Sequence, residues 1–184
     1  MNSAILLIIQ VIFGFLATIF TLRFYMQLCN VSTSHDLVQM IIRLTNTICS
    51  FFSKVIPRYK NIELSSIIIA IFFEFILIYL TQLIFKVENI ETKKIILISI
   101  LKFFETNIHI VMFSTIALAI LSWINPVSNL MLFLRQMTDI FLNTIRKVVP
   151  SISGIDISPI ILLLICQIII IWPLNDLKGL IIVS

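Results

Sequence analysis

The stretch from residue 44 to residue 68, LTNTICSFFSKVIPRYKNIELSSII, can be laid over residues 137–161, MTDIFLNTIRKVVPSISGIDISPII, without a gap. The two stretches are 25 residues long and lie 93 positions apart. Glu63 is matched by Asp156, and the identical pairs include Thr45/Thr138, Lys54/Lys147, Pro57/Pro150, Ile62/Ile155 and Ser65/Ser158. Self-similarity at a fixed spacing indicates a duplicated structural unit. We therefore expect two repeats of one architecture.

The composition is that of a membrane protein. Hydrophobic residues make up 60% of the chain and charged residues 12%, and the mean hydropathy is +1.14. Soluble domains have about 45–50% apolar and about 25% charged residues. A helix needs about 20 mostly apolar residues to cross a bilayer. Such stretches occur near residues 4–22, 64–85, 108–124 and 156–175, so we predict an all-α membrane protein with four transmembrane helices.

An amphipathic segment follows the first transmembrane helix of each repeat. Apolar residues in 37–56 and again in 126–149 gather on one side of a helix drawn at about 100° per residue. The polar sides carry Arg43, Lys54, Arg135, Arg146 and Lys147. Charges cost about 2.5–3.5 kcal/mol each at the centre of a spanning helix. We therefore expect both segments to lie in the membrane interface.

Proline residues mark the end of each amphipathic segment. Pro57 and Pro150 stop a helix, because the residue before proline is disfavoured in the α region. Gly154 permits a sharp turn after the second segment, and Ser158-Pro159 begins a new helix. We therefore expect each repeat to consist of a transmembrane helix, an amphipathic interfacial helix, a proline-containing turn and a second transmembrane helix.

The boundaries of the two repeats follow from this pattern. Residues 1–85 form the first repeat and residues 108–184 the second, and the two are parallel because each crosses the membrane twice. Residues 86–107 are a polar connector. We interpret Ile95–Thr106 within it as an outer-surface helix, and a single tilted helix from Ile95 to Trp123 is the alternative.

Basic residues predict the orientation. Five of them lie on the side of the connector: Lys86, Lys93, Lys94, Lys102 and Lys178. Eight lie on the side of the amphipathic segments: Arg23, Arg43, Lys54, Arg58, Lys60, Arg135, Arg146 and Lys147. Because cytoplasmic loops carry the excess of Lys and Arg, we expect the amphipathic segments in the cytoplasm and both termini outside.

The turn sequences resemble those of the YggT family, also called YlmG. The residues are Lys54-Val55-Ile56-Pro57, and Arg146-Lys147-Val148-Val149-Pro150 followed by Gly154-Ile155-Asp156-Ile157-Ser158-Pro159. The helix end at 23–28, with Arg23, fits the same pattern. The first copy departs from it, with Asn61-Ile62-Glu63-Leu64-Ser65-Ser66, and Arg23 has no basic counterpart in 117–120.

The resemblance implies a multi-pass protein of the bacterial inner membrane. Members of that family have been linked to osmotic tolerance, to division-site and nucleoid organisation, and to cytochrome assembly in plastids. These links imply no shared biochemical activity.

Two polar residues fall inside predicted spans. Glu74 lies in the middle of the second, and Gln167 is its equivalent in the second repeat. A carboxylate inside the membrane is a candidate for an ion or proton role. The alternative is a hydrogen bond between helices, which contributes about 0.6 kcal/mol on average.

The sequence favours a non-enzymatic function. It has no pairing of a nucleophile with a base, no phosphate-binding loop and no metal-ligand spacing, so we expect no enzyme and no cofactor. We expect a protein that organises the membrane or its cytoplasmic-face partners through the amphipathic helices. The expected partners are the lipid bilayer and anionic lipid or another membrane protein. We expect no binding of nucleic acid. The alternative is a small ion channel or channel modulator built around Glu74 and Gln167.

The orientation can be tested with reporter fusions. Because basic residues favour the amphipathic side as cytoplasmic, fusions at Ser53 and Ser151 should report cytoplasm, and a fusion at Ser184 should report the outside. A cytoplasmic C-terminus would contradict the orientation.

Overall fold

Long apolar helices dominate the structure. It is a computed structural model that describes residues 2–54, 56, 58–59, 62–85, 91–149 and 156–183. Its long helices are α1 (Asn2–Leu28), α3 (Leu64–Phe85), α4 (Thr92–Ile124) and the continuous run of α6 (Ser158–Ile169), η1 (Ile170–Leu174) and α7 (Asn175–Val183). These contain four candidate membrane spans, Ala4–Leu28, Leu64–Ile84, Thr92–Ile124 and Ser158–Ile181. The prediction of a helical protein with four long apolar segments is confirmed.

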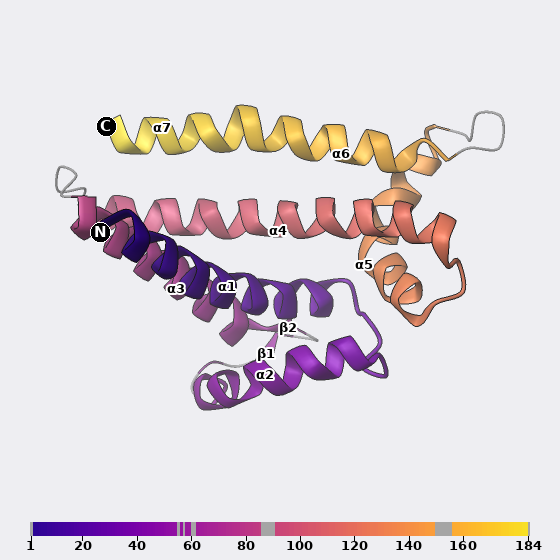
Figure 1. Cartoon of the computed structure of the whole chain (residues 1–184), viewed down its shortest axis with the longest axis horizontal. Coiled ribbons are helices and arrows are strands. Elements are labelled where there is room, and N and C mark those ends of the chain that lie inside the picture. Colours follow the sequence, from indigo (N-terminus) through magenta and orange to yellow (C-terminus); the bar gives the residue numbers. More distant parts are fainter. Residues whose placement is uncertain are drawn as a thin grey trace.

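The long helices form two groups. α1 and α3 lie side by side, and α6, η1 and α7 run along α4 (Figure 1). α3 also packs on α4, so α4 connects the two groups. Both termini lie at the same end of the molecule (Figure 1).

The helix run at the C-terminal end contains a π-helical turn. η1 includes Pro173, which has no backbone N–H to donate to an earlier carbonyl. A π-helical turn accommodates one extra residue without ending the helix. The run from Ser158 therefore continues past Pro173 to the last described residue, Val183.

Two shorter helices follow the first and third spans. They are α2 (Asp36–Phe52) and α5 (Asn129–Arg146), within the predicted segments 37–56 and 126–149 except for the first residue of α2. α5 begins at Asn129 and not at residue 126, because the Ser128 side chain caps it, accepting a hydrogen bond from the Met131 N–H at 3.2 Å. The predicted turn residues Pro57, Pro150, Gly154 and Ile155 lie outside the described residues.

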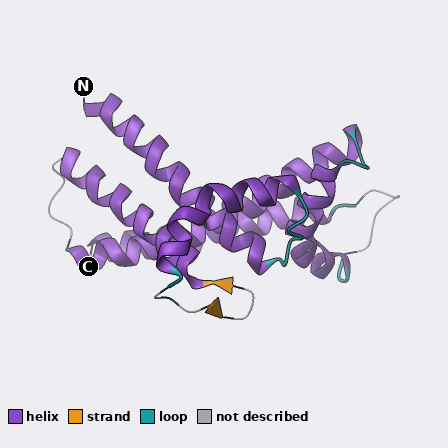
Figure 2. Cartoon of the chain, turned by 90° about the horizontal axis from the view of Figure 1, so that it is seen from below, coloured by secondary structure: helices purple, strands orange, loops and turns teal. Residues whose placement is uncertain are grey.

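A small hairpin departs from the all-α prediction. β1 (Arg58–Tyr59) pairs antiparallel with β2 (Ile62–Glu63), with Arg58 opposite Glu63. Figure 2 shows it at the edge of the helices. It leads directly into α3, so it positions the start of that span.

α4 corrects one sequence interpretation. The chain is helical without a break from Thr92 to Ile124, so Ile95–Thr106 is not a separate surface helix and the single-helix alternative is the observed one. The charges that suggested a surface location are paired. Glu105 accepts hydrogen bonds from Lys178 of α7 and from Lys102, the latter at 3.1 Å. Pairing lowers the cost of placing charged groups inside a helix bundle.

The packed interior has two clusters. The larger joins the end of α1 to α2, α4, α5 and α6, and includes the fully buried Tyr25, Met137 and Leu142. The smaller surrounds Phe20 and Phe103, between α1, α3 and α4. Inside a bilayer such contacts stabilise by close packing, because lipid chains are as apolar as the side chains.

Candidate functional site

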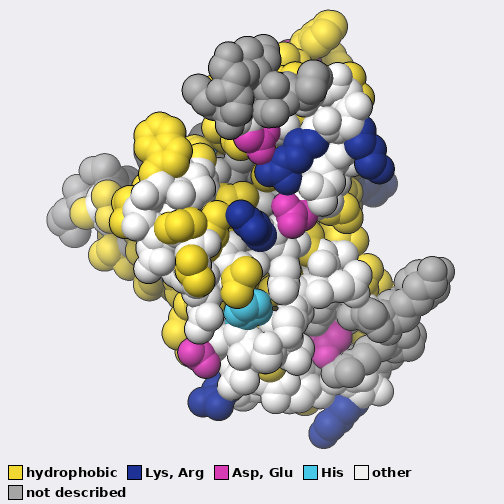
Figure 3. Space-filling model, turned by 90° about the vertical axis from the view of Figure 1, so that its right-hand side faces the viewer, with side chains coloured by type: hydrophobic (Ala, Val, Ile, Leu, Met, Phe, Trp, Pro, Cys, Tyr) yellow, Lys and Arg dark blue, Asp and Glu magenta, His cyan; other side chains and the backbone are white. Residues whose placement is uncertain are grey.

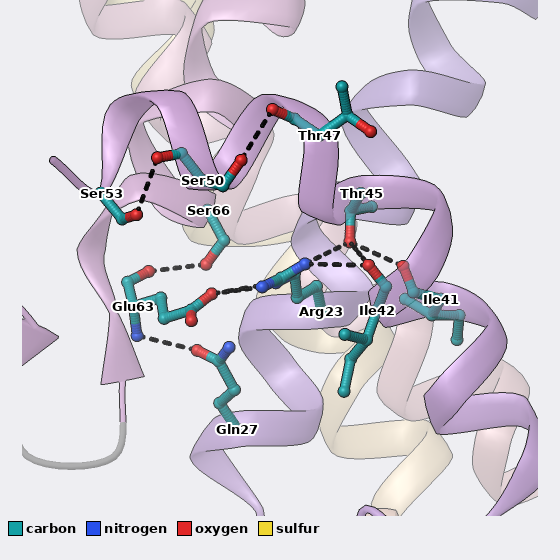
Figure 4. A network of polar contacts seen from close by, with 10 residues as sticks. All are labelled: Arg23, Gln27, Ile41, Ile42, Thr45, Thr47, Ser50, Ser53, Glu63 and Ser66. Atoms are coloured by element: carbon teal, nitrogen blue, oxygen red, sulfur yellow. Dashed lines mark hydrogen bonds and ion pairs between the residues drawn. The ribbon is translucent and has the colours of Figure 1, made fainter.

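Near the C-terminal end of α1, a buried arginine joins three parts of the chain (Figure 4). The Arg23 Nη2 and Nε atoms donate to Glu63 Oε2 at 2.6 and 3.1 Å. Its Nη1 donates to Thr45 Oγ1 at 2.6 Å and to the Ile42 carbonyl oxygen at 3.3 Å. The Arg23 and Glu63 side chains are only 4% and 9% exposed. The guanidinium group therefore connects α1 and α2 to the turn at which α3 begins.

Two further hydrogen bonds hold the Glu63 backbone. Its N–H donates to Gln27 Oε1 at 2.8 Å, and Ser66 Oγ donates to its carbonyl oxygen at 2.7 Å. Gln27 lies one helical turn after Arg23, so both side chains extend toward the same turn. A buried charge is tolerated when it is paired and hydrogen-bonded. Arg23 meets both conditions although it lies within an apolar span.

The other side of the same helix end contacts α5. Tyr25 is 2% exposed, and its hydroxyl donates to the Met137 carbonyl oxygen at 2.6 Å. Just beyond α1, the Ser32 N–H donates to Gln136 Oε1 at 2.9 Å. Residues two apart on a helix point in nearly opposite directions, so Arg23 reaches α2 while Tyr25 reaches α5. The end of α1 thus binds both shorter helices.

The second half of the chain has an ion pair at the equivalent turn. Arg146 of α5 donates to Asp156 Oδ2 from Nη2 at 2.7 Å and from Nε at 2.9 Å. The Ser158 N–H donates to the other oxygen, Oδ1, at 2.9 Å. Burial acts to raise the pKa of Asp156, but these hydrogen bonds outweigh it and hold the pKa below its ordinary value. Both side chains are 41% exposed, so this pair is solvated where the Arg23–Glu63 pair is not.

The two turns use matching carboxylates but different arginines. Glu63 and Asp156 occupy equivalent positions, yet Arg23 comes from a long apolar helix and Arg146 from a shorter one. All four residues can be singled out from the sequence, but neither pair can be predicted from it. The available signal was a lone arginine at the end of an apolar stretch together with a carboxylate in the repeated motif.

The predicted basic residues are mostly free to contact other molecules. Arg43, Lys54, Arg135 and Lys147 are exposed. Arg146 is exposed as well, but Asp156 and Asn143 bind its guanidinium group. The end of the molecule seen in Figure 3 shows basic side chains spread among hydrophobic ones. On this end of the molecule the basic side chains are therefore dispersed and do not form one compact cluster.

The structure does not bring Glu74 and Gln167 together. Glu74 is 3% exposed, and its Oε1 accepts a hydrogen bond from Thr106 Oγ1 of α4 at 3.1 Å. Its Oε2 is buried with no hydrogen-bond partner among the described residues. Gln167 is exposed on α6. The expectation of a joint site is therefore wrong, because Glu74 faces α4 while Gln167 faces outward.

The described motif residues fall at the starts of spans. Ile62 lies in β2, and Ser65 and Ser158 are each 1% exposed in the first turn of α3 and α6. Pro159 is in the first turn of α6, where its missing N–H has no helical partner to lose. In the part of the chain that the structure describes, no cluster of three or more His, Cys, Asp or Glu is placed to hold a metal ion.

Most of the chain matches the model of one protein family. The family model of CCB3/YggT matches residues 2–84 and 97–175. The chain belongs to the CCB3/YggT family. The resemblance found in the sequence motifs is thereby confirmed, and family membership and the apolar helices together indicate a membrane protein.

Similar proteins come from several bacteria. PA0392 of Pseudomonas aeruginosa is 27% identical over 97% of this chain and 92% of its own length. YggT of Escherichia coli K12 is 29% identical over 80% of this chain and 77% of its own. A Haemophilus influenzae protein is 25% identical over 91% and 90%. All three are described as uncharacterized, and no solved structure matches the chain.

Substituting the carboxylates at the two turns should lower the free energy of unfolding by different amounts. Glu63→Gln leaves Arg23 buried without its counter-charge, so it should lower the free energy of unfolding by about 3–5 kcal/mol. Asp156→Asn removes a solvated pair and should cost about 0–1 kcal/mol. Unfolding of the purified proteins in detergent measures both, and equal losses would contradict the distinction.

Proposed function

We propose that this protein is a non-enzymatic, multi-pass membrane protein that uses α2 and α5 as a surface for anionic lipid headgroups on the cytoplasmic face. In this role it organises the membrane or the proteins attached to that face, as osmotic tolerance or division requires. The proposal rests on the placement of apolar and basic side chains on the two helices.

The exposed apolar side chains of α2 carry the proposal. Val38, Ile41 and Cys49 are buried against the protein, whereas Leu44 and Phe51 are 60% and 71% exposed. At about 100° per residue, the exposed apolar side lies roughly a third of a turn from the buried one. Exposing apolar side chains to water is unfavourable in free energy. A helix lying in the interface places this side among the acyl chains and its polar side toward the headgroups.

α5 also exposes apolar side chains beside its buried ones. Met137 and Leu134 are buried, while Leu130 and Phe141 on the same side of the helix are 41% and 37% exposed. Arg135 is exposed on the same helix. The hydrogen bonds of Arg23 and Tyr25 hold both helices at the end of α1, so the two exposed surfaces are fixed relative to the spans.

We include the two-repeat, parallel architecture in the proposal. Thr45 and Thr138 occupy equivalent positions, and each is buried and donates to the carbonyl oxygen four residues earlier. Ser65 and Ser158 are likewise both buried at span starts. The family model also matches two stretches of similar length. These equivalences support a duplication with two crossings per copy.

The orientation places the basic helices where anionic lipid is found. Eight basic residues against five favour this side as cytoplasmic in a bacterial inner membrane, with both termini outside. Lys and Arg near an anionic leaflet contribute about 1 kcal/mol each. Four exposed basic residues can therefore select anionic headgroups.

Neutralising the free basic residues tests the proposal. The variant carries Arg43→Gln, Lys54→Gln, Arg135→Gln and Lys147→Gln, and it retains Arg146 because Asp156 already binds it. At about 1 kcal/mol per charge, its affinity for phosphatidylglycerol should fall at least about tenfold. Mass spectrometry of lipids retained from mixed vesicles measures the change.

A matched control removes charge from the opposite end of the molecule. Lys93→Gln with Lys94→Gln in the first turn of α4 should leave phosphatidylglycerol retention unchanged. Unchanged retention in the fourfold variant, or an equal loss in this control, would contradict a role of α2 and α5 in lipid binding.

Glu74 favours a second candidate function, a small ion channel or channel modulator. Its Oε2 is buried with no hydrogen-bond partner among the described residues, beside Thr106. Lys102, Glu105 and Lys178 form a charged cluster on the neighbouring helices. Polar groups held inside spans commonly mark ion or proton pathways.

The channel candidate predicts an effect of Glu74→Gln. The change removes one ionisable group from a side chain of similar shape, so it should alter ion flux in reconstituted vesicles while expression is kept. Glu91→Gln, at an exposed position before α4, serves as the control. If the ion flux of the Glu74→Gln variant equals that of the unmodified protein, the channel candidate loses its support.

A further inference from the structure

The outer face of α6 and of the π-helical turn η1 carries a stripe of exposed residues, of which Ile171 lies in η1. Ile160, Leu164 and Ile171 are 59%, 59% and 58% exposed, and Gln167 is exposed between them. The four positions are spaced by four, three and four residues. This alternation keeps side chains on one seam of a helix and is the spacing by which two helices pack along their length.

Gln167 is the unusual member of the stripe. It is the tenth residue of the 24-residue candidate span Ser158–Ile181, so it lies near the middle of the bilayer. Its side chain makes no hydrogen bond in the part of the chain that the structure describes. Hydrocarbon offers no partner to an amide, so each unsatisfied group costs several kcal/mol. None of the described residues satisfies the amide, so we look for its partner outside this part of the chain.

The protein itself leaves this face uncovered. α6 packs mainly on α4 and α5, through Leu162 and Cys166, which are buried on the side of α6 away from the stripe. Glu74, which aligns with Gln167 at the spacing of 93 residues, is buried against α4. No described side chain of this chain is therefore placed to bind the Gln167 amide.

A second copy of the same chain fits the exposed amide. The side-chain amide is both a donor and an acceptor, so two Gln167 side chains related by a twofold axis can satisfy each other at one depth. Lipid headgroups lie too far from mid-bilayer to do so, and acyl chains have no hydrogen-bonding groups. Polar residues at single seam positions also fix the register of paired helices.

We propose that the protein forms a twofold dimer through the outer face of α6, in which Ile160, Leu164 and Ile171 pack against their equivalents and the two Gln167 amides hydrogen-bond to each other. The proposal rests on α6 being a membrane span, which the proposed function also assumes, and it is independent of lipid binding by α2 and α5.

Disulfide crosslinking in membranes tests the geometry. In a background with Cys29→Ala, Cys49→Ala and Cys166→Ala, a single Leu164→Cys should form a covalent dimer with a membrane-permeant oxidant. The adjacent Ile165→Cys is the matched control, because it is 42% exposed but points about 100° away from the stripe. Equal crosslinking at both positions, or none at Leu164→Cys, would overturn the proposed face.

A second measurement keeps the native cysteines. Gln167→Leu changes an exposed position, so the protein should fold normally and its dimer association constant should fall by about 3- to 30-fold. Ile168→Leu, on the flank of the stripe, should leave it unchanged. Native mass spectrometry in lipid nanodiscs at a series of dilutions measures both. A monomeric unmodified protein, or a Gln167→Leu variant that associates equally well, would overturn the proposal.

Discussion

The buried ion pair between Arg23 and Glu63 is the constraint on which the rest of the structure depends. A guanidinium group at the end of an apolar helix is stable there only while its charge is neutralised and its N–H groups are bonded. Glu63 supplies the charge and Thr45 a hydroxyl oxygen, so satisfying one side chain fixes the positions of α2 and of the start of α3. With Tyr25 binding α5 from the same helix end, the two shorter helices are held against the spans at one end of the molecule.

In the two halves of the chain, different interactions hold the shorter helix against the spans. At the second turn the arginine lies on the shorter helix itself, as Arg146, and its pair with Asp156 is exposed to solvent. A solvated pair of this kind contributes little to stability, whereas breaking the buried one is costly. α5 depends instead on apolar packing around Met137 and Leu142 and on Tyr25. The two halves of the chain are thus asymmetric: an ion pair holds the shorter helix in the first half, and apolar packing holds it in the second.

Local sequence features predicted much of this fold. The four long apolar segments and the approximate positions of α2 and α5 follow from segment length and from the spacing of apolar residues. The Arg23–Glu63 pair could not be predicted, because it joins residues 40 positions apart and depends on how the helices pack. The same is true of α4. Its charged residues Lys102 and Glu105 suggest a surface helix, and only the folded chain places Lys178 beside Glu105. Glu74 and Gln167 were predicted as polar residues within spans, but the direction in which each side chain points depends on helix rotation, which the sequence alone does not fix.

Hydrogen–deuterium exchange of α2 in an Arg23→Gln variant tests the central claim most directly. If Arg23 anchors α2, the amides of residues 36–52 should lose most of their protection, because the local opening of that helix becomes easier. The amides of α5, which is held by Tyr25 and by its own core contacts, should keep theirs. Unchanged protection of α2 would show that apolar packing alone holds it, and it would contradict the account of the ion pair as the constraint that positions this end of the protein.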